Sequence, residues 1–130
     1  MILLDTHIWI LWVSDISKLS KKVLNIIKKK VEDGICISNI SIWEVTKLVE
    51  KGRIEFKVSL SEWIEEALRY PGLKVINLDK EIILHSAKLK NFHKDPADQL
   101  IVSTSIMKNI PLLTYDKRKL DYEFVQTIKF

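Results

Sequence analysis

Four carboxylates stand where the elements of an α/β fold are expected to begin or end. Asp5 follows an apolar run at the start of the chain, and Asp116 follows another after residue 110. Glu44 and Asp98 fall in the first turns of two expected helices. Two carboxylates about 5 Å apart repel by about 3 kcal/mol at an effective dielectric constant of about 20. If the four meet, they must take up protons or bind a cation, and oxygen ligands select a hard ion such as Mg²⁺ or Mn²⁺.

Each carboxylate also has a purely structural interpretation. Ser41 and Glu44 have the spacing of a capping box, in which Glu44 would satisfy a backbone N–H. Any acid is favourable at the position of Asp98, because the helix dipole is positive there. Asp116 has a residue type that is common in turns. Spacing alone therefore leaves a metal site and ordinary capping roles both open.

The elements that must position these residues alternate between strands and helices. Apolar runs predict strands at residues 1–4, 35–37, 73–78 and 111–114, with a further edge strand at 124–128. Helical spacing predicts helices at 8–12, 19–31, between Ser41 and Gly52, at 60–69, at 79–90 and from Asp95 to Asn109. This order predicts an α/β fold: a three-layer α/β/α sandwich around a mostly parallel sheet of four or five strands. The carboxyl ends of the strands should meet at one edge, where ligands bind in such sheets.

Length and composition limit the kind of protein this is. The chain has 130 residues, which predicts a single domain over residues 1–130. Its net charge of +4 is compatible with a polyanionic partner without requiring one. The single cysteine, Cys36, excludes an intramolecular disulfide, and its apolar neighbours predict a buried thiol. No apolar run is long enough for a secretory signal or a membrane span, so we expect a cytoplasmic protein with no membrane association.

Several other enzyme classes lack the residues that they require. A phosphatase of the haloacid dehalogenase type needs a second aspartate two positions after Asp5, where His7 stands. A response-regulator receiver carries its phosphorylated aspartate after the third strand, where only Asp79 is found, at a helix-cap position. Nucleotide-binding folds need a glycine-rich turn, and the three glycines of this chain are isolated.

Four motifs in sequence order resemble those of PIN-domain proteins, specifically VapC-type toxins of bacterial and archaeal toxin–antitoxin pairs. They span nearly the whole chain: Leu3-Leu4-Asp5-Thr6-His7, Ser38-x-x-Ser41-x-Trp43-Glu44, His93-Lys94-Asp95-Pro96-Ala97-Asp98-Gln99-Leu100-Ile101 and Leu113-Thr114-Tyr115-Asp116. The first and third motifs together are quite specific, and the other two are weak alone.

The resemblance implies that Asp5, Glu44, Asp98 and Asp116 are the catalytic residues and the ligands of Mg²⁺ or Mn²⁺. Asp95 would cap its helix and stand next to the ligands. Thr6 and Thr114 would support the ligands or the phosphate, and a backbone-capping role is open for both. Gln99 stands where many relatives have arginine, which removes a positive group beside the site.

By the same resemblance, the activity would be that of a metal-dependent endoribonuclease, the toxin of a type II toxin–antitoxin pair. RNA would be the substrate, and a cognate antitoxin and a second copy of the chain would be the partners. We expect apolar contact area for a homodimer from Trp9, Trp12 and the 60–69 helix with Trp63. We expect His7 and His93 to serve in packing or hydrogen bonding rather than as a general base. The alternative is a non-catalytic PIN-like module that binds RNA or protein.

Overall fold

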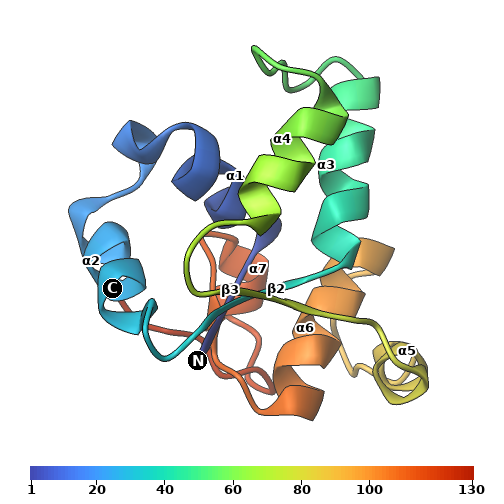
Figure 1. Cartoon of the computed structure of the whole chain (residues 1–130). Helices are drawn as coiled ribbons and strands as arrows, with labels where there is room; N and C mark the ends of the chain where they lie inside the picture. The colour runs from blue at the N-terminus through green and yellow to red at the C-terminus, as the bar shows by residue number, and fades with distance from the viewer.

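The centre of the fold is a parallel sheet of four short strands. The computed structural model describes all residues, 1–130. The strands are β1 (Ile2–Leu4), β2 (Ile35–Ser38), β3 (Leu73–Ile76) and β4 (Leu112–Leu113), in the order β3-β2-β1-β4 (Figure 1). Every neighbouring pair is parallel, so all four carboxyl ends face the same edge. The predicted α/β fold with a central parallel sheet is confirmed.

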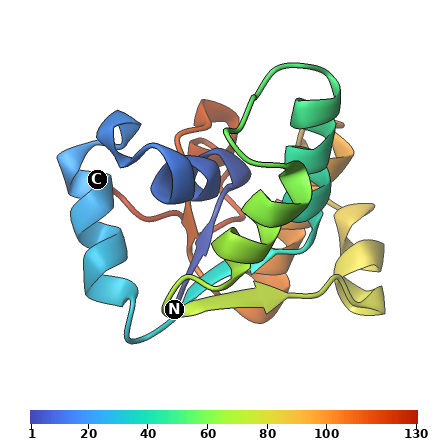
Figure 2. The same cartoon turned by 45° about the horizontal axis from the view of Figure 1, so that its top comes forward.

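Seven α-helices and one 3-10 turn connect and cover the strands. The helices are α1 (Thr6–Ser14), α2 (Lys21–Lys30), α3 (Ile40–Glu50), α4 (Leu60–Leu68), α5 (Lys80–Ser86), α6 (Pro96–Lys108) and α7 (Lys117–Leu120), and the turn is η1 (Ile16–Lys18). In both views α3 and α4 lie side by side, and α5 lies beside α6 (Figures 1 and 2). None of the helices combines the length and the apolar character needed to cross a membrane.

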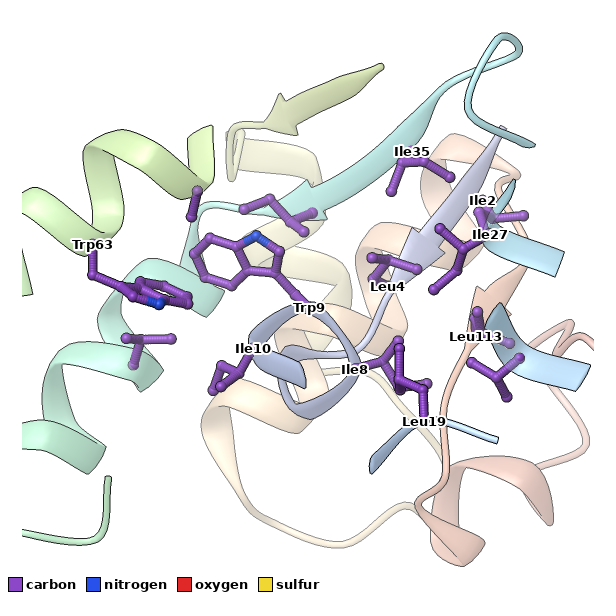
Figure 3. Close-up of a cluster of buried hydrophobic side chains, with 14 residues drawn as sticks. Ile2, Leu4, Ile8, Trp9, Ile10, Leu19, Ile27, Ile35, Trp63 and Leu113 are labelled. Atoms are coloured by element: carbon purple, nitrogen blue, oxygen red, sulfur yellow. The ribbon is translucent and has the colours of Figure 1, made fainter. Parts of the chain in front are cut away.

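Two apolar cores lie on opposite faces of the sheet. Alternate strand residues point to opposite faces, so Ile2 and Leu4 join one core while Leu3 joins the other. The larger core contains residues of α1, α2, α3 and α4, including Trp9 and Trp63 (Figure 3). The smaller core contains Leu3, Cys36 and Leu112 from the strands and Ile101 and Val102 from α6, with Tyr122 and Val125 beyond α7. The sheet is therefore the middle layer of a three-layer sandwich, as predicted.

The expected homodimer contacts of Trp9 and Trp63 are wrong, because both side chains are in the larger core. Trp9 is fully buried and meets Trp63 edge to face at 5.1 Å between ring centroids. Trp12 is half-buried against Tyr70, with 5.0 Å between their centroids.

Several predicted elements are shorter in the structure. The predicted edge strand at 124–128 is wrong, since only one isolated bridge joins Thr127 to Leu112. The two-residue strand β4 is too short to extend a ladder of hydrogen bonds along that segment. The helix expected at 79–90 stops at Ser86, and the chain turns through Asn91, which has a positive φ of 57°.

Candidate active site

Asp5 and Asp116 leave neighbouring strands at the carboxyl edge of the sheet. Asp5 follows β1, caps α1 by accepting from the Thr6 backbone N–H at 3.0 Å, and is only 5% exposed. Asp116 comes three residues after β4 and caps α7 by accepting from the Arg118 backbone N–H at 2.9 Å. Since β1 pairs directly with β4, the two carboxylates are brought to the same place.

Asp98 reaches the same place from the first turn of α6. Asp95 caps this helix by accepting from the Asp98 backbone N–H at 3.1 Å, and Pro96 follows as the first helical residue. Pro fits that position because its missing N–H would have no partner there. The predicted cap role of Asp95 is confirmed, and it directs the buried Asp98 side chain toward the sheet edge.

The Lys119 ammonium lies among these three carboxylates. Its Nζ is 2.9 Å and 2.8 Å from the two oxygens of Asp5, 2.5 Å from Asp98 Oδ1 and 4.0 Å from Asp116 Oδ2. The residue is only 2% exposed. Burial by itself would lower the pKa of Lys119, but the negative charge of Asp5 and the hydrogen bonds to Asp5 and Asp98 outweigh it and raise that pKa. We call Asp5, Asp98, Asp116 and Lys119 the charged cluster.

The sequence analysis did not predict Lys119. It belongs to the run Lys117-Arg118-Lys119, which has the pattern of a solvated surface. The one available signal is its spacing, since a residue three positions after the helix cap Asp116 shares a face with it.

Arg118 and His93 contact the outer side of the charged cluster. Arg118 Nη2 lies 3.1 Å from Asp116 Oδ2 and 3.5 Å from Asp98 Oδ2, and the arginine side chain is 61% exposed. Burial alone would raise the pKa of Asp116, but its hydrogen bonds with Arg118 outweigh this and lower that pKa. His93 Nε2 lies 3.2 Å from Asp98 Oδ2, and Gln99 Nε2 donates to the His93 carbonyl at 3.2 Å. Gln99 therefore helps to position His93.

Glu44 lies next to the charged cluster but is not part of it. The Thr6 hydroxyl donates to Glu44 Oε1 at 2.5 Å and also pairs with the Ser41 hydroxyl at 2.8 Å. The capping-box interpretation of Ser41 and Glu44 is wrong, because the residue before α3 is Asn39 and Ser41 lies within the helix. Burial raises the pKa of Glu44, and the nearby Asp5 acts in the same direction, against the hydrogen bond from Thr6.

Thr114 connects the two strand-end aspartates. Its hydroxyl donates to Asp5 Oδ2 at 2.6 Å and accepts from the Asp116 backbone N–H at 2.9 Å. Both alternatives left open for this threonine, support of a carboxylate and backbone capping, therefore describe it. Thr6 contacts Glu44 rather than a backbone group through its hydroxyl.

A groove of about 470 Å³ lies between α3 and the start of α6 and reaches the site at Glu44. Its walls carry the ring of Trp43, three basic side chains, Lys47, Lys51 and Arg53, and three acidic ones, Glu44, Glu50 and Asp95. Trp43 is 51% exposed. Exposed aromatic rings beside basic groups are common in surfaces that bind single-stranded nucleic acid.

The charged cluster has the chemistry of a divalent cation site. An ammonium group already occupies its centre, which shows that the carboxylates favour a cation there. One ligand atom each from His93, Asp98 and Asp116 can be chosen so that all lie within 4.8 Å of one another. Carboxylate oxygens suit Mg²⁺ or Mn²⁺, and an imidazole nitrogen in the set favours Mn²⁺ over Mg²⁺.

A comparison of the sequence with models of protein families matches the PIN domain over residues 2–125. The chain belongs to the PIN domain family. This PIN domain is 26% identical over 118 residues to "Ribonuclease VapC22" of Mycobacterium tuberculosis, a match that covers 90% of this chain and 88% of that protein.

Solved structures share the fold of this PIN domain. A structure of VapBC2 from Rickettsia felis, bound to a DNA fragment from their promoter, superposes with a TM-score of 0.75 at 20% identity, and the match covers 98% of both chains. A toxin–antitoxin complex from Klebsiella pneumoniae gives a TM-score of 0.62 at 21% identity, covering 93% of this chain and 91% of the other.

Proposed function

We propose that this PIN domain is a metal-dependent endoribonuclease and the toxin of a type II toxin–antitoxin pair. The observation that carries the proposal is the convergence of Asp5, Asp98 and Asp116, from three distant segments, around one buried cationic group. The similarity to a protein named as a ribonuclease supports the activity, and the similarity to toxin–antitoxin complexes supports the biological role.

Asp5, Asp98 and Asp116 are the proposed ligands of Mg²⁺ or Mn²⁺, with Glu44 as a more distant acidic group. When bound, such an ion polarises the scissile phosphate and lowers the pKa of a water molecule to the neutral range. The Thr114 hydroxyl holds the Asp5 carboxylate at 2.6 Å, and the Thr6 hydroxyl holds Glu44. The exposed Arg118 guanidinium is suited to a phosphate oxygen, since it presents several N–H donors in one plane.

RNA is proposed to reach the site along the groove between α3 and α6. A single strand there would place a base against Trp43 and its phosphates near Lys47, Lys51 and Arg53. Stacking on an aromatic ring needs an unpaired base, which favours single-stranded regions over a continuous duplex.

The decisive experiment is an RNA cleavage assay with purified protein and added Mg²⁺ or Mn²⁺. We expect cleavage with either ion, none with a chelator, and a loss of at least about a hundredfold in Asp98→Asn. Asp121→Asn is the matched control, because Asp121 is exposed and lies outside the charged cluster. Both variants must show the wild-type circular dichroism spectrum.

Two results would contradict the proposal. Cleavage that survives in Asp98→Asn would remove this residue from the catalytic set. RNA binding without cleavage, with either ion and with a folded wild-type protein, would favour the non-catalytic binding module.

The partners follow from the proposed role. A toxin needs a cognate antitoxin, which we expect to cover the charged cluster or the groove between α3 and α6. A homodimer and a cytoplasmic location are also part of the proposal. Co-purification with the antitoxin should abolish RNA cleavage. Undiminished cleavage by a stable complex of the two proteins would argue against inhibition by occlusion of the site.

A further inference from the structure

We propose that Lys119 permanently fills one cation position of the charged cluster, so that the protein binds a single divalent ion, held by Asp98, Asp116 and His93. The inference rests on the proposed metal-dependent function and goes beyond it in assigning the number of ions and the position of the ion. It also revises the proposed ligand set: His93 replaces Asp5, because Lys119 already contacts both oxygens of Asp5. It can be tested by metal binding alone.

The position of Lys119 is fixed by its helix and by its contacts. The helix α7 is tied to Asp116, whose backbone carbonyl accepts from Lys119 N at 3.0 Å and from Leu120 N at 2.9 Å. The ammonium contacts both oxygens of Asp5 and Oδ1 of Asp98. Because Lys119 is almost fully buried, its side chain cannot leave these oxygens for solvent unless α7 moves.

The opposite side of the same carboxylates is open to exchange. Asp98 Oδ2 and Asp116 Oδ2 face the guanidinium of Arg118, which is largely exposed and can move into solvent. His93 Nε2 completes this side; it is buried, lies 3.2 Å from Asp98 Oδ2 and makes no hydrogen bond. Oxygens of two carboxylates and an imidazole nitrogen thus form a ligand set that the lysine does not block.

Arg118 and the ion would exclude each other. Arg118 Nη1 lies 3.3 Å from His93 Nδ1 as well as near the two carboxylates. A metal bound at Nε2 requires the imidazole proton on Nδ1, so Arg118 must leave that nitrogen when the ion binds. The exposed arginine then becomes available to a phosphate.

The charges agree with one ion. The three carboxylates carry three negative charges, and one ammonium with one divalent ion neutralises them. A second divalent ion in the position of Lys119 would have to be placed beside a buried positive charge, which is strongly unfavourable in a site closed to water. The imidazole nitrogen also predicts tighter binding of Mn²⁺ than of Mg²⁺.

The test is the stoichiometry of Mn²⁺ binding to metal-free protein, measured by calorimetric titration and by the electron paramagnetic resonance signal of free Mn²⁺. We expect one ion per chain in the wild type and in the control Lys117→Met, which removes an exposed lysine of the same helix. Lys119→Met should bind two ions per chain, because it vacates the inner position without removing a carboxylate.

His93→Gln is a second variant that does not depend on the folding of Lys119→Met. It should keep one ion per chain but weaken the affinity for Mn²⁺ about tenfold or more, and it should reduce the preference for Mn²⁺ over Mg²⁺. If Lys119→Met does not fold even with Mn²⁺, the wild-type stoichiometry and His93→Gln decide the question.

Two ions per wild-type chain, one ion in folded Lys119→Met, or unchanged affinity in His93→Gln would each overturn the inference. Its failure can be distinguished from failure of the proposed function. Cleavage of RNA by a protein that binds two ions would refute only the inference. Binding of one ion without any cleavage would refute only the function.

Discussion

Lys119 shows how one side chain makes an acidic cluster compatible with a folded core. Three carboxylates at this distance would otherwise repel by several kcal/mol. The lysine offsets that repulsion, and its own burial is offset by the hydrogen bonds that it donates. A buried charge of this kind is tolerated only while its partners are present.

Thr114→Val tests the hydrogen bonds that support the carboxylates, because it removes them without changing any charge. Valine has the shape of threonine but loses the hydrogen bond to Asp5 and the one accepted from the Asp116 backbone. The Asp116 N–H would be left unpaired, while Asp5 Oδ2 would keep its contact with Lys119. The loss of both hydrogen bonds should lower the free energy of unfolding by about 1–3 kcal/mol. Denaturant unfolding measures it, with Thr127→Val, which loses no side-chain hydrogen bond, as the control. Equal stabilities of the two variants would show that the Thr114 hydroxyl is not needed.

Glu44→Gln should stabilise the metal-free protein in a way that depends on pH. The raised pKa of Glu44 means that its ionised form is disfavoured in the folded state. The stability contribution of Glu44 is therefore fully present below its unfolded pKa of about 4.3 and is lost as the pH rises through the folded pKa. Glutamine keeps the acceptor for Thr6 and cannot ionise.

Melting temperatures in the presence of a chelator, from pH 4 to pH 8, test this expectation. Glu44→Gln should melt above the wild type at pH 7, and the difference should shrink toward pH 4. Glu50→Gln, at an exposed position of the same helix, should show no such trend. A difference that grows toward low pH would reverse the assigned direction of the shift.

The predicted acidic residues and the unpredicted lysine differ in the kind of information that identifies them. Asp5 directly follows a buried strand, and Asp98 lies in the first turn of a helix that begins with proline. Sequence patterns could therefore locate both residues. The contact of Lys119 with Asp5 spans 114 positions of the chain. No local pattern carries such a contact, and only the pairing of β1 with β4 creates it.

Helix starts were predicted better than strand ends, because capping residues set them locally. Asp79 and Asp95 each cap a helix by accepting from a backbone N–H three residues later, as predicted, and Ser59 caps α4 in the same way. Strand ends depend instead on the length of the neighbouring strand. The segment 124–128 has a strand-like composition but lies beside a strand of only two residues.

Gly72 should be far less replaceable than Gly52, although both have a positive φ, of 80° and 70°. A Cβ at Gly72 would lie 2.4 Å from the backbone oxygen of Val31, whereas nothing lies within 4 Å of one at Gly52. We expect Gly52→Ala to cost about 1–2 kcal/mol from the backbone conformation alone. Gly72→Ala should cost about 1–3 kcal/mol more, because the turn before β3 must move away from the end of α2.

Denaturant unfolding of the two alanine variants checks this difference. The glycine pair controls for the backbone conformation, so the excess at Gly72 reports the close approach. Equal losses of stability in the two variants would show that the turn at Gly72 can move away from Val31 without cost.

The whole molecule depends on two cores that share one thin sheet. The larger core contains the rings of Trp9 and Trp63 (Figure 3). The half-buried ring of Phe56 packs against this core and stacks on Trp63, with 4.4 Å between ring centroids. Trp43 of α3 instead points outward into the groove.

Trp63→Ala should lower the free energy of unfolding by about 3–5 kcal/mol, because it leaves a large cavity in the larger core. Trp43→Ala should change it by no more than about 0.5 kcal/mol, while weakening the binding of single-stranded RNA if the groove is the substrate path. Denaturant unfolding and RNA-binding titrations measure the two effects. A large loss of stability in Trp43→Ala would place this ring in the fold rather than in the groove.

Fold class and layer order could be predicted from the sequence, since alternating apolar runs and helix signals are spread along the whole chain. The choice of which tryptophans are buried could not, because all four have the same residue type and burial is decided by the packing of α1 against α4. The extent of the single domain, residues 1–130, stays a prediction.

The pairing of β1 with β4 also has a consequence for the time at which the protein could become harmful. A ribosome must deliver everything from Asp5 to Lys119 before the pocket can close around a cation. Chains that end before β4 would lack Asp116, so under the proposed function a growing polypeptide could not yet cleave RNA near the ribosome that is producing it.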